Sequence, residues 1–262
     1  MKIIDAHMHL GEFAVFGESI NHKQLVELMD QYDVEKAVVS ALPNSLTVEA
    51  VEKYPERITG LVRVNPHEVE APDIVEKGLT EWGLKGVKLN PLFNNFLPDS
   101  KEVNPVMDVA AKHNVPVLIH CGHPPWSLPW SFERLADRYP DVTIVMAHMG
   151  HGHILYINGA LDVAEDHSNI VVDTAGMTMH TKIKEAVNRL GVERVMYGSD
   201  TPLGHPAWEI SKVKVSSASS ACSIRAVRPE STCTRSLRPE TSPCSVLRSP
   251  WMASSSTVSS LT

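Results

Sequence analysis

The chain has 262 residues, of which 43% are hydrophobic, and a formal net charge of −7 at pH 7. A chain of this length and composition can bury a core large enough for one domain of α/β-barrel size. The acidic balance argues against nucleic acid and anionic membrane surfaces as main partners, because neither attracts a negatively charged protein. We therefore expect a small-molecule substrate, and the chain is compatible with a homo-oligomer.

Two further features of the composition concern the compartment. No apolar run approaches 18 residues, and no charged segment followed by an apolar stretch opens the chain, so we expect neither a membrane span nor a secretory leader. Four cysteines in a chain of this length do not make a disulfide framework. The sequence therefore predicts a cytoplasmic protein.

Eight apolar, β-rich runs that end in small or polar residues recur along the chain. They are residues 3–9, 36–42, 58–65, 84–90, 116–121, 143–148, 170–174 and 195–200. The segments between them carry apolar residues at helical spacing, as at Leu25, Leu28 and Met29. Nearly continuous apolar strands that alternate with helices predict an α/β fold, the (β/α)8 or TIM barrel. A doubly wound open sheet is the alternative, but it usually has a Gly-rich loop after its first strand, where this chain has His7-Met8-His9-Leu10-Gly11.

The first run delivers two histidines, His7 and His9, two residues apart. Side chains alternate along a strand, so Asp5, His7 and His9 share one face, which suits two imidazoles that bind one metal ion. In a barrel the active site lies at the carboxyl ends of the strands. The candidate residues at those ends are His7, His9, Lys88, Asn90, His120, His148, Asp173 and Asp200.

Four segments together resemble a known superfamily. They are Asp5-Ala6-His7-Met8-His9, Ile119-His120-Cys121, Ala147-His148-Met149-Gly150 and Tyr197-Gly198-Ser199-Asp200-Thr201-Pro202. In this order they look like the amidohydrolase superfamily, and more narrowly its amidohydrolase-related group (family 2) of metal-dependent hydrolases and non-oxidative decarboxylases. The resemblance covers residues 1 to about 215. It implies a distorted TIM barrel with a divalent metal, usually zinc, held by His7, His9, His120 and Asp200, and it implies a catalytic role for His148.

The residue types agree with that chemistry. Three imidazoles and one carboxylate suit Zn²⁺, with Mn²⁺, Fe²⁺ or Co²⁺ as further candidates. Asp200 can accept the proton of an attacking water, and His148 can polarise a carbonyl or stabilise an oxyanion. Two residues also have structural alternatives, His120 as a core histidine and Asp200 as a turn cap.

Lys88 has three candidate roles. In some branches of the superfamily a lysine at the end of the fourth strand is carboxylated and bridges two metals. The second candidate role of Lys88 is to bind a substrate anion, and the third is to form an ion pair with Asp200.

The leading functional prediction is a metal-dependent hydrolase of a small carboxylic ester, lactone or amide. The alternative is a metal-dependent non-oxidative decarboxylase of a small, aromatic carboxylic acid. The two share their ligands, but the decarboxylase needs an aromatic wall and a cationic anchor, whereas the hydrolase needs an ordered water.

The composition changes abruptly near Ser216. Of the 47 residues from there to the end, 15 are serine, and Gly and His are missing. A segment of this composition buries too little apolar surface to offset the conformational entropy lost on ordering. We therefore predict a barrel domain at 1–215 and a disordered Ser/Arg/Pro-rich tail at 216–262 in place of the eighth helix. The change resembles an out-of-frame translation, and a metal-binding but inactive copy is accordingly a second functional alternative.

Overall fold

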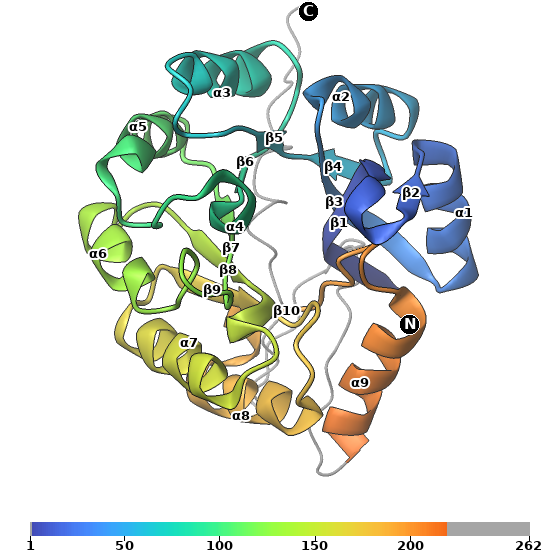
Figure 1. Ribbon diagram of the computed structural model, residues 1–262. Coiled ribbons are helices and arrows are strands. Elements are labelled where there is room, and N and C mark those ends of the chain that lie inside the picture. Colours follow the sequence, from blue (N-terminus) through green and yellow to red (C-terminus); the bar gives the residue numbers. More distant parts are fainter. Residues whose placement is uncertain (1, 219–262) are drawn as a thin grey trace, which may run out of the picture.

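Parallel strands form the wall of a barrel in the computed structural model, which describes residues 2–218 (Figure 1). The strands are β1 (Ile3–Phe13), β2 (Glu18–Ile20), β3 (Val34–Ala41), β4 (Ile58–Gly60), β5 (Val62–Arg63), β6 (Val87–Leu89), β7 (Val117–His120), β8 (Ile144–Ala147), β9 (Ile170–Asp173) and β10 (Val195–Met196). The helices are α1 (His22–Gln31), α2 (Asn44–Lys53), α3 (Ala71–Thr80), α4 (Pro91–Asn94), α5 (Asn104–Lys112), α6 (Ser131–Arg138), α7 (Ile154–Asp166), α8 (His180–Leu190) and α9 (Pro206–Ala218). The predicted TIM barrel is confirmed, and each predicted strand run contains a barrel strand.

The strands of the barrel form two sheets, and backbone hydrogen bonds join the two sheets at two places, which we call the seams. β4 and β5 are successive pieces of one predicted run, and Leu61 between them donates its N–H to the carbonyl of Val39 at 2.9 Å. At the second seam the first and last strands meet, because Ala6 N–H donates to Tyr197 O at 2.8 Å and His9 N–H to Thr201 O at 2.7 Å. β2 adds an antiparallel strand to the end of β1 and lies outside the barrel order.

Strand register decides which side chains enter the barrel. Along β5 to β9 the residues Arg63, Lys88, Leu118, Val145 and Val171 lie side by side in register. Leu118, Val145 and Val171 form a small cluster separate from the core between strands and helices. This layer therefore fills the interior, and it places Arg63 and Lys88 inside the barrel rather than under a helix.

The helices cover the outside of the barrel with one apolar face each. In α6 the buried residues are Phe132, Leu135 and Ala136, at the helical spacing seen in the sequence. Among residues 2–218 no helix is both long and apolar enough to cross a membrane.

The final helix differs from the sequence prediction. In Figure 1, α9 lies in the outer ring between α8 and α1, and it packs against α8. It begins at Pro206 and continues past Val215 to Ala218, so a helix occupies the position where the tail was expected to replace one. The apolar residues Ile210 and Val213 pack toward the core, which explains why this segment is helical despite the change of composition near its end. The remainder of the predicted tail, residues 219–262, lies outside the described residues.

Candidate metal centre

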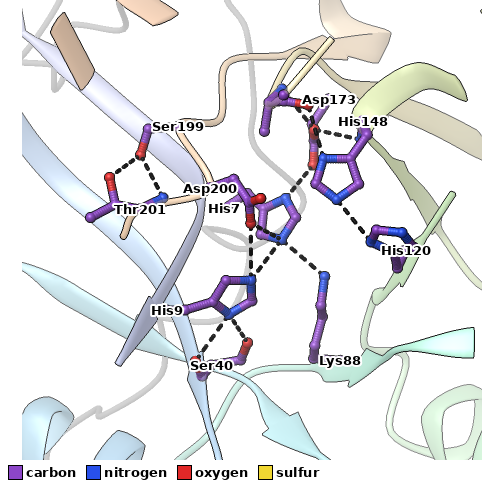
Figure 2. Close-up of polar contacts among 12 residues, drawn as sticks. His7, His9, Ser40, Lys88, His120, His148, Asp173, Ser199, Asp200 and Thr201 are labelled. Atoms are coloured by element: carbon purple, nitrogen blue, oxygen red, sulfur yellow. Dashed lines mark hydrogen bonds and ion pairs between the residues drawn. The ribbon is translucent and has the colours of Figure 1, made fainter. Parts of the chain in front are cut away.

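Two side chains from β1 and one from the segment after β10 converge at the barrel mouth (Figure 2). His7 Nε2 lies 3.2 Å from His9 Nε2, and Asp200 Oδ1 lies 3.5 Å from the first and 3.2 Å from the second. A cation bound tetrahedrally at about 2.0–2.1 Å from three donors would separate them by about 3.3–3.4 Å. The spacing of His7, His9 and Asp200 therefore fits one small divalent cation.

Both histidines are held in the orientation that metal binding requires. His7 Nδ1 lies 3.0 Å from Asp173 Oδ2, and His9 Nδ1 lies 3.0 Å from Ser40 Oγ and 3.2 Å from the Ser40 carbonyl oxygen. Because a carboxylate and a carbonyl only accept, each Nδ1 carries the hydrogen and each Nε2 presents its lone pair. Metal-binding histidines are oriented in the same way by a carboxylate or carbonyl behind the ring.

Asp173 organises the side of the centre behind His7. It is fully buried, and its Oδ1 accepts from the N–H groups of His148 at 2.8 Å and Ala175 at 3.0 Å. Burial alone would raise the pKa of Asp173, but the neighbouring His7 lowers it overall. His7, His148 and Asp173 form a second group of close potential ligands. In this group the carboxylate already accepts hydrogen bonds from the His7 ring and from the backbone N–H of His148.

Asp200 is placed by unusual backbone geometry. Its φ is 56°, in the left-handed region, and its N–H donates to the His7 carbonyl at 2.8 Å. Aspartate tolerates this region better than most residues. Just before it, a Cβ added to Gly198 would come within 2.9 Å of His7 Cβ, so only glycine lets β10 approach β1 this closely.

The ionisation states also suit a cation. Burial would raise the pKa of Asp200, but His7, His9 and His148 lower it well below its usual range, so the carboxylate is charged. Burial lowers the pKa of His9 to about 4 and that of His148 to about 3, so both rings are neutral at pH 7. Neutral imidazoles and an ionised carboxylate are the forms that ligate metals.

Lys88 reaches the same point from β6, which is not adjacent to β1 in the barrel. Its Nζ lies 2.9 Å from His7 Nε2, and the side chain is almost fully buried. Burial lowers the pKa of Lys88 to about 8, so a fraction of this amine is neutral near neutral pH. In this structure Lys88 contacts His7 rather than forming the ion pair with Asp200 considered above.

His120 stands next to the cluster but is not part of it. Its Nδ1 lies 3.0 Å from His148 Nε2 and its Nε2 lies 2.8 Å from His123 Nδ1. His148 Nδ1 lies 2.9 Å from the carbonyl of Ala175, which fixes the hydrogen on that nitrogen. The structure thus brings together three of the four predicted ligands, and the role of His120 stays a prediction.

The centre opens into a cavity of about 750 Å³, a size suited to a small molecule. Its walls include His9, His120 and Asp200 as well as Phe93 and Trp208. The residues behind the histidines, Ser40 and Asp173, were not predicted to have a role, although Asp173 was among the candidate residues at the strand ends. Arg63 was not predicted either, and the only signal for it was a cation near the end of the third predicted strand.

Comparisons with known proteins identify a family and similar folds. The amidohydrolase family model matches residues 4–215. No curated protein was found to match the sequence. The fold is similar to that of a 5-carboxyvanillate decarboxylase from Novosphingobium aromaticivorans, solved with manganese and 4-hydroxy-3-methoxy-5-nitrobenzoic acid. Their TM-score is 0.66 at 16% identity, over 80% of this chain and 89% of that one.

Two other solved structures of similar fold are named for a decarboxylase and for a hydrolase. A 2,6-dihydroxybenzoate decarboxylase from Rhizobium has a TM-score of 0.64 at 15% identity, over 83% of this chain and 93% of that one. A probable 2-pyrone-4,6-dicarboxylic acid hydrolase from Acinetobacter baumannii, with citric acid bound, has a TM-score of 0.62 at 17% identity, over 82% and 92%. At these identities the similarity shows the shared barrel alone.

Proposed function

Because the chain belongs to the amidohydrolase family, we propose that it is a metal-dependent hydrolase that acts on a small carboxylic ester, lactone or amide. The observation that carries this proposal is the convergence of His7, His9 and Asp200, whose donor atoms lie 3.2–3.5 Å apart at the mouth of the barrel. The spacing and burial of these three residues, and the ionisation of His9 and Asp200, suit one divalent cation.

We assign the cation to His7, His9, Asp200 and His120. His120 would complete the set by exchanging its contact with His123 for the cation. Three imidazoles and a carboxylate favour Zn²⁺, while Mn²⁺, which the decarboxylase of similar fold holds, is the first alternative. Lys88 is proposed to contact the substrate or, if carboxylated, to bridge a second ion.

A divalent cation would supply a polarised carbonyl and a bound water whose pKa falls toward about 7. Asp200 is ionised and is itself one of the proposed ligands, and its carboxylate can also accept the proton of the attacking water and return it to the leaving group. His148 is neutral and has no hydrogen on Nε2, so it must gain a proton before it donates to an oxyanion. A substrate anion beside His148 would favour that protonated form.

A non-oxidative decarboxylase remains the second candidate, and the cavity supplies an observation for it. The wall contains aromatic side chains, among them Phe13, Phe93 and Trp208, together with the cation Arg63. These are the aromatic wall and the cationic anchor that such an enzyme needs. By contrast, an inactive copy was predicted because the eighth outer helix of the barrel was expected to be missing. The helix α9 occupies that position.

Metal content and activity of the purified full-length protein test the proposal. We expect about one equivalent of divalent metal by elemental analysis, its loss in His7→Ala, and loss of ester and lactone hydrolysis in Asp200→Asn. His113→Ala is the matched control, because this histidine is partly exposed and pairs with Glu76 outside the cavity. A protein that takes up no metal on reconstitution would contradict the proposal, and release of CO2 from aromatic acids without hydrolysis would favour the decarboxylase.

A further inference from the structure

Among the residues that the structure describes, the buried guanidinium of Arg63 in the cavity wall has no hydrogen-bond or ion-pair partner. The residue is 7% exposed, and its Nε is a buried donor with no acceptor. Within residues 2–218 no hydrogen bond or ion pair from this guanidinium is formed. Buried polar groups are normally hydrogen-bonded, and a buried charge is normally paired, because an unsatisfied one is costly. Burial lowers the pKa of Arg63 and the charge of Asp200 opposes that effect, but within the described part of the chain Asp200 forms no ion pair with it, so the N–H donors of the guanidinium can bind an anionic ligand.

A second cation stands directly beside it. Arg63 and Lys88 are paired in register on β5 and β6, and both side chains lie in the layer that enters the barrel. Like charges on neighbouring strands repel each other. Lys88 has a hydrogen-bond partner in His7, whereas the guanidinium of Arg63 forms no hydrogen bond within residues 2–218, so Arg63 is the cation whose donors are free.

The backbone at Arg63 is fixed rather than adaptable. The Asn44 side chain, at the start of α2, accepts from Arg63 N–H at 2.8 Å and donates to Arg63 O at 2.9 Å. The Arg63 guanidinium carbon lies over the Phe93 ring, 6.0 Å from its centroid, and both residues line the cavity. The backbone from which the side chain enters the cavity is thus fixed before any ligand arrives, which reduces the entropy lost on binding.

We propose that Arg63 is the specificity residue of the cavity and binds a carboxylate of the substrate, while the reacting group of the same molecule faces His7, His9 and Asp200. This inference rests on the proposed function and narrows it to substrates that carry a carboxylate besides, or as part of, the group that reacts. The planar guanidinium offers paired N–H donors that match the two oxygens of a carboxylate. The apolar walls, including Phe13, Phe93 and Met177, suit the carbon skeleton of a small organic acid.

Equilibrium binding to the metal-loaded full-length protein tests the proposal. The probes are benzoate, its neutral analogue benzamide and the dianion phenyl phosphate, each followed by calorimetry. The variants are Arg63→Met, which keeps the length and removes the charge, Arg63→Lys, and the control Arg134→Met, whose side chain is exposed and pairs with Asp99 outside the cavity. Metal content and thermal unfolding are measured for each variant, so that a loss of folding is recognised.

We expect the wild-type protein to prefer benzoate over benzamide by at least about tenfold, the scale of a charge-assisted hydrogen bond. Arg63→Met should lose that preference with its metal content unchanged, Arg63→Lys should keep part of it, and Arg134→Met should keep all of it. A preference that survives in Arg63→Met would place the carboxylate on the metal and overturn the proposal. So would the absence of a preference in the wild type, or an Arg63-dependent preference for phenyl phosphate over benzoate.

The metal result separates this inference from the function on which it rests. If the wild type binds metal and hydrolyses neutral esters but shows no Arg63-dependent preference for carboxylates, only the assignment of Arg63 is wrong. If it binds no metal at all, the proposed function fails whatever the probes show.

Discussion

Replacing Asp173 by Asn should weaken metal binding although Asp173 is not itself a proposed ligand. The carboxylate accepts three hydrogen bonds, from His7 Nδ1 at 3.0 Å and from the N–H groups of His148 at 2.8 Å and Ala175 at 3.0 Å. Asparagine can keep its oxygen toward the two N–H groups, but it then directs its NH2 at His7 Nδ1. The two hydrogens would clash, so the His7 hydrogen must move to Nε2, the atom that faces His9 and Asp200.

The expected size follows from that tautomer change. Loss of the group that orients a metal-binding histidine typically costs 10- to 100-fold in metal affinity, which is about 1.4–2.7 kcal/mol. Competition with a chromogenic chelator measures the affinity of wild type and Asp173→Asn for Zn²⁺ directly. Because Asp173 is fully buried, thermal unfolding of the metal-free proteins must be measured in parallel.

The control is a similar pair on the surface. His167 Nε2 lies 3.3 Å from Asp137 Oδ1, whose side chain is 71% exposed, and Asp137→Asn should leave zinc affinity unchanged. If Asp173→Asn is folded and binds zinc as tightly as the wild type, the tautomer argument is wrong, and with it the assignment of His7 Nε2 as a ligand atom.

Three further substitutions probe the frame around the centre. Gly198→Ala puts a Cβ within 2.9 Å of His7 Cβ, so we expect a loss of about 1–3 kcal/mol in unfolding free energy together with reduced metal content, and unchanged metal content would refute the close-approach argument. Phe132→Ala empties a fully buried position on α6 and should cost about 3–5 kcal/mol in urea unfolding; a cost below 1 kcal/mol would mean that this helix is not firmly packed. Lys212→Met removes the ammonium that donates to the carbonyls of Thr174 and Met177 and pairs with Glu209, so we expect a loss of about 1–3 kcal/mol by the same measurement, whereas a stability equal to that of the wild type would show that water replaces these contacts.

The fold was accessible from the sequence because a parallel barrel leaves a strong pattern. Strands covered on both sides are nearly continuous in apolar residues, and this identified runs such as 117–120 and 144–147 within one or two residues. The same topology brings strand ends together, so His7, His9 and Asp200 could be predicted to meet although β1 and β10 lie at opposite ends of the described chain.

What the sequence could not reveal depends on side-chain direction and on pairing between strands. The contact of His120 with His123 is a rotamer outcome, and no spacing encodes it. Arg63 becomes notable only when the register puts it beside Lys88 and its guanidinium is seen to form no ion pair within residues 2–218. The helix at the end of the described chain was missed because its last turn is serine-rich, while the apolar contacts of Ile210 and Val213 that hold it are tertiary.

The second seam of the barrel has a consequence for how the protein folds. The backbone bonds that close the barrel, from Asp200 N–H to His7 O and from His9 N–H to Thr201 O, join the residues that would ligate the cation. Contacts between positions so distant in sequence carry a large loop-closure cost and tend to form late. A cation bound there would therefore stabilise the closed barrel in the last step of folding. Metal uptake during refolding would then occur together with closure of the barrel and would report when it happens.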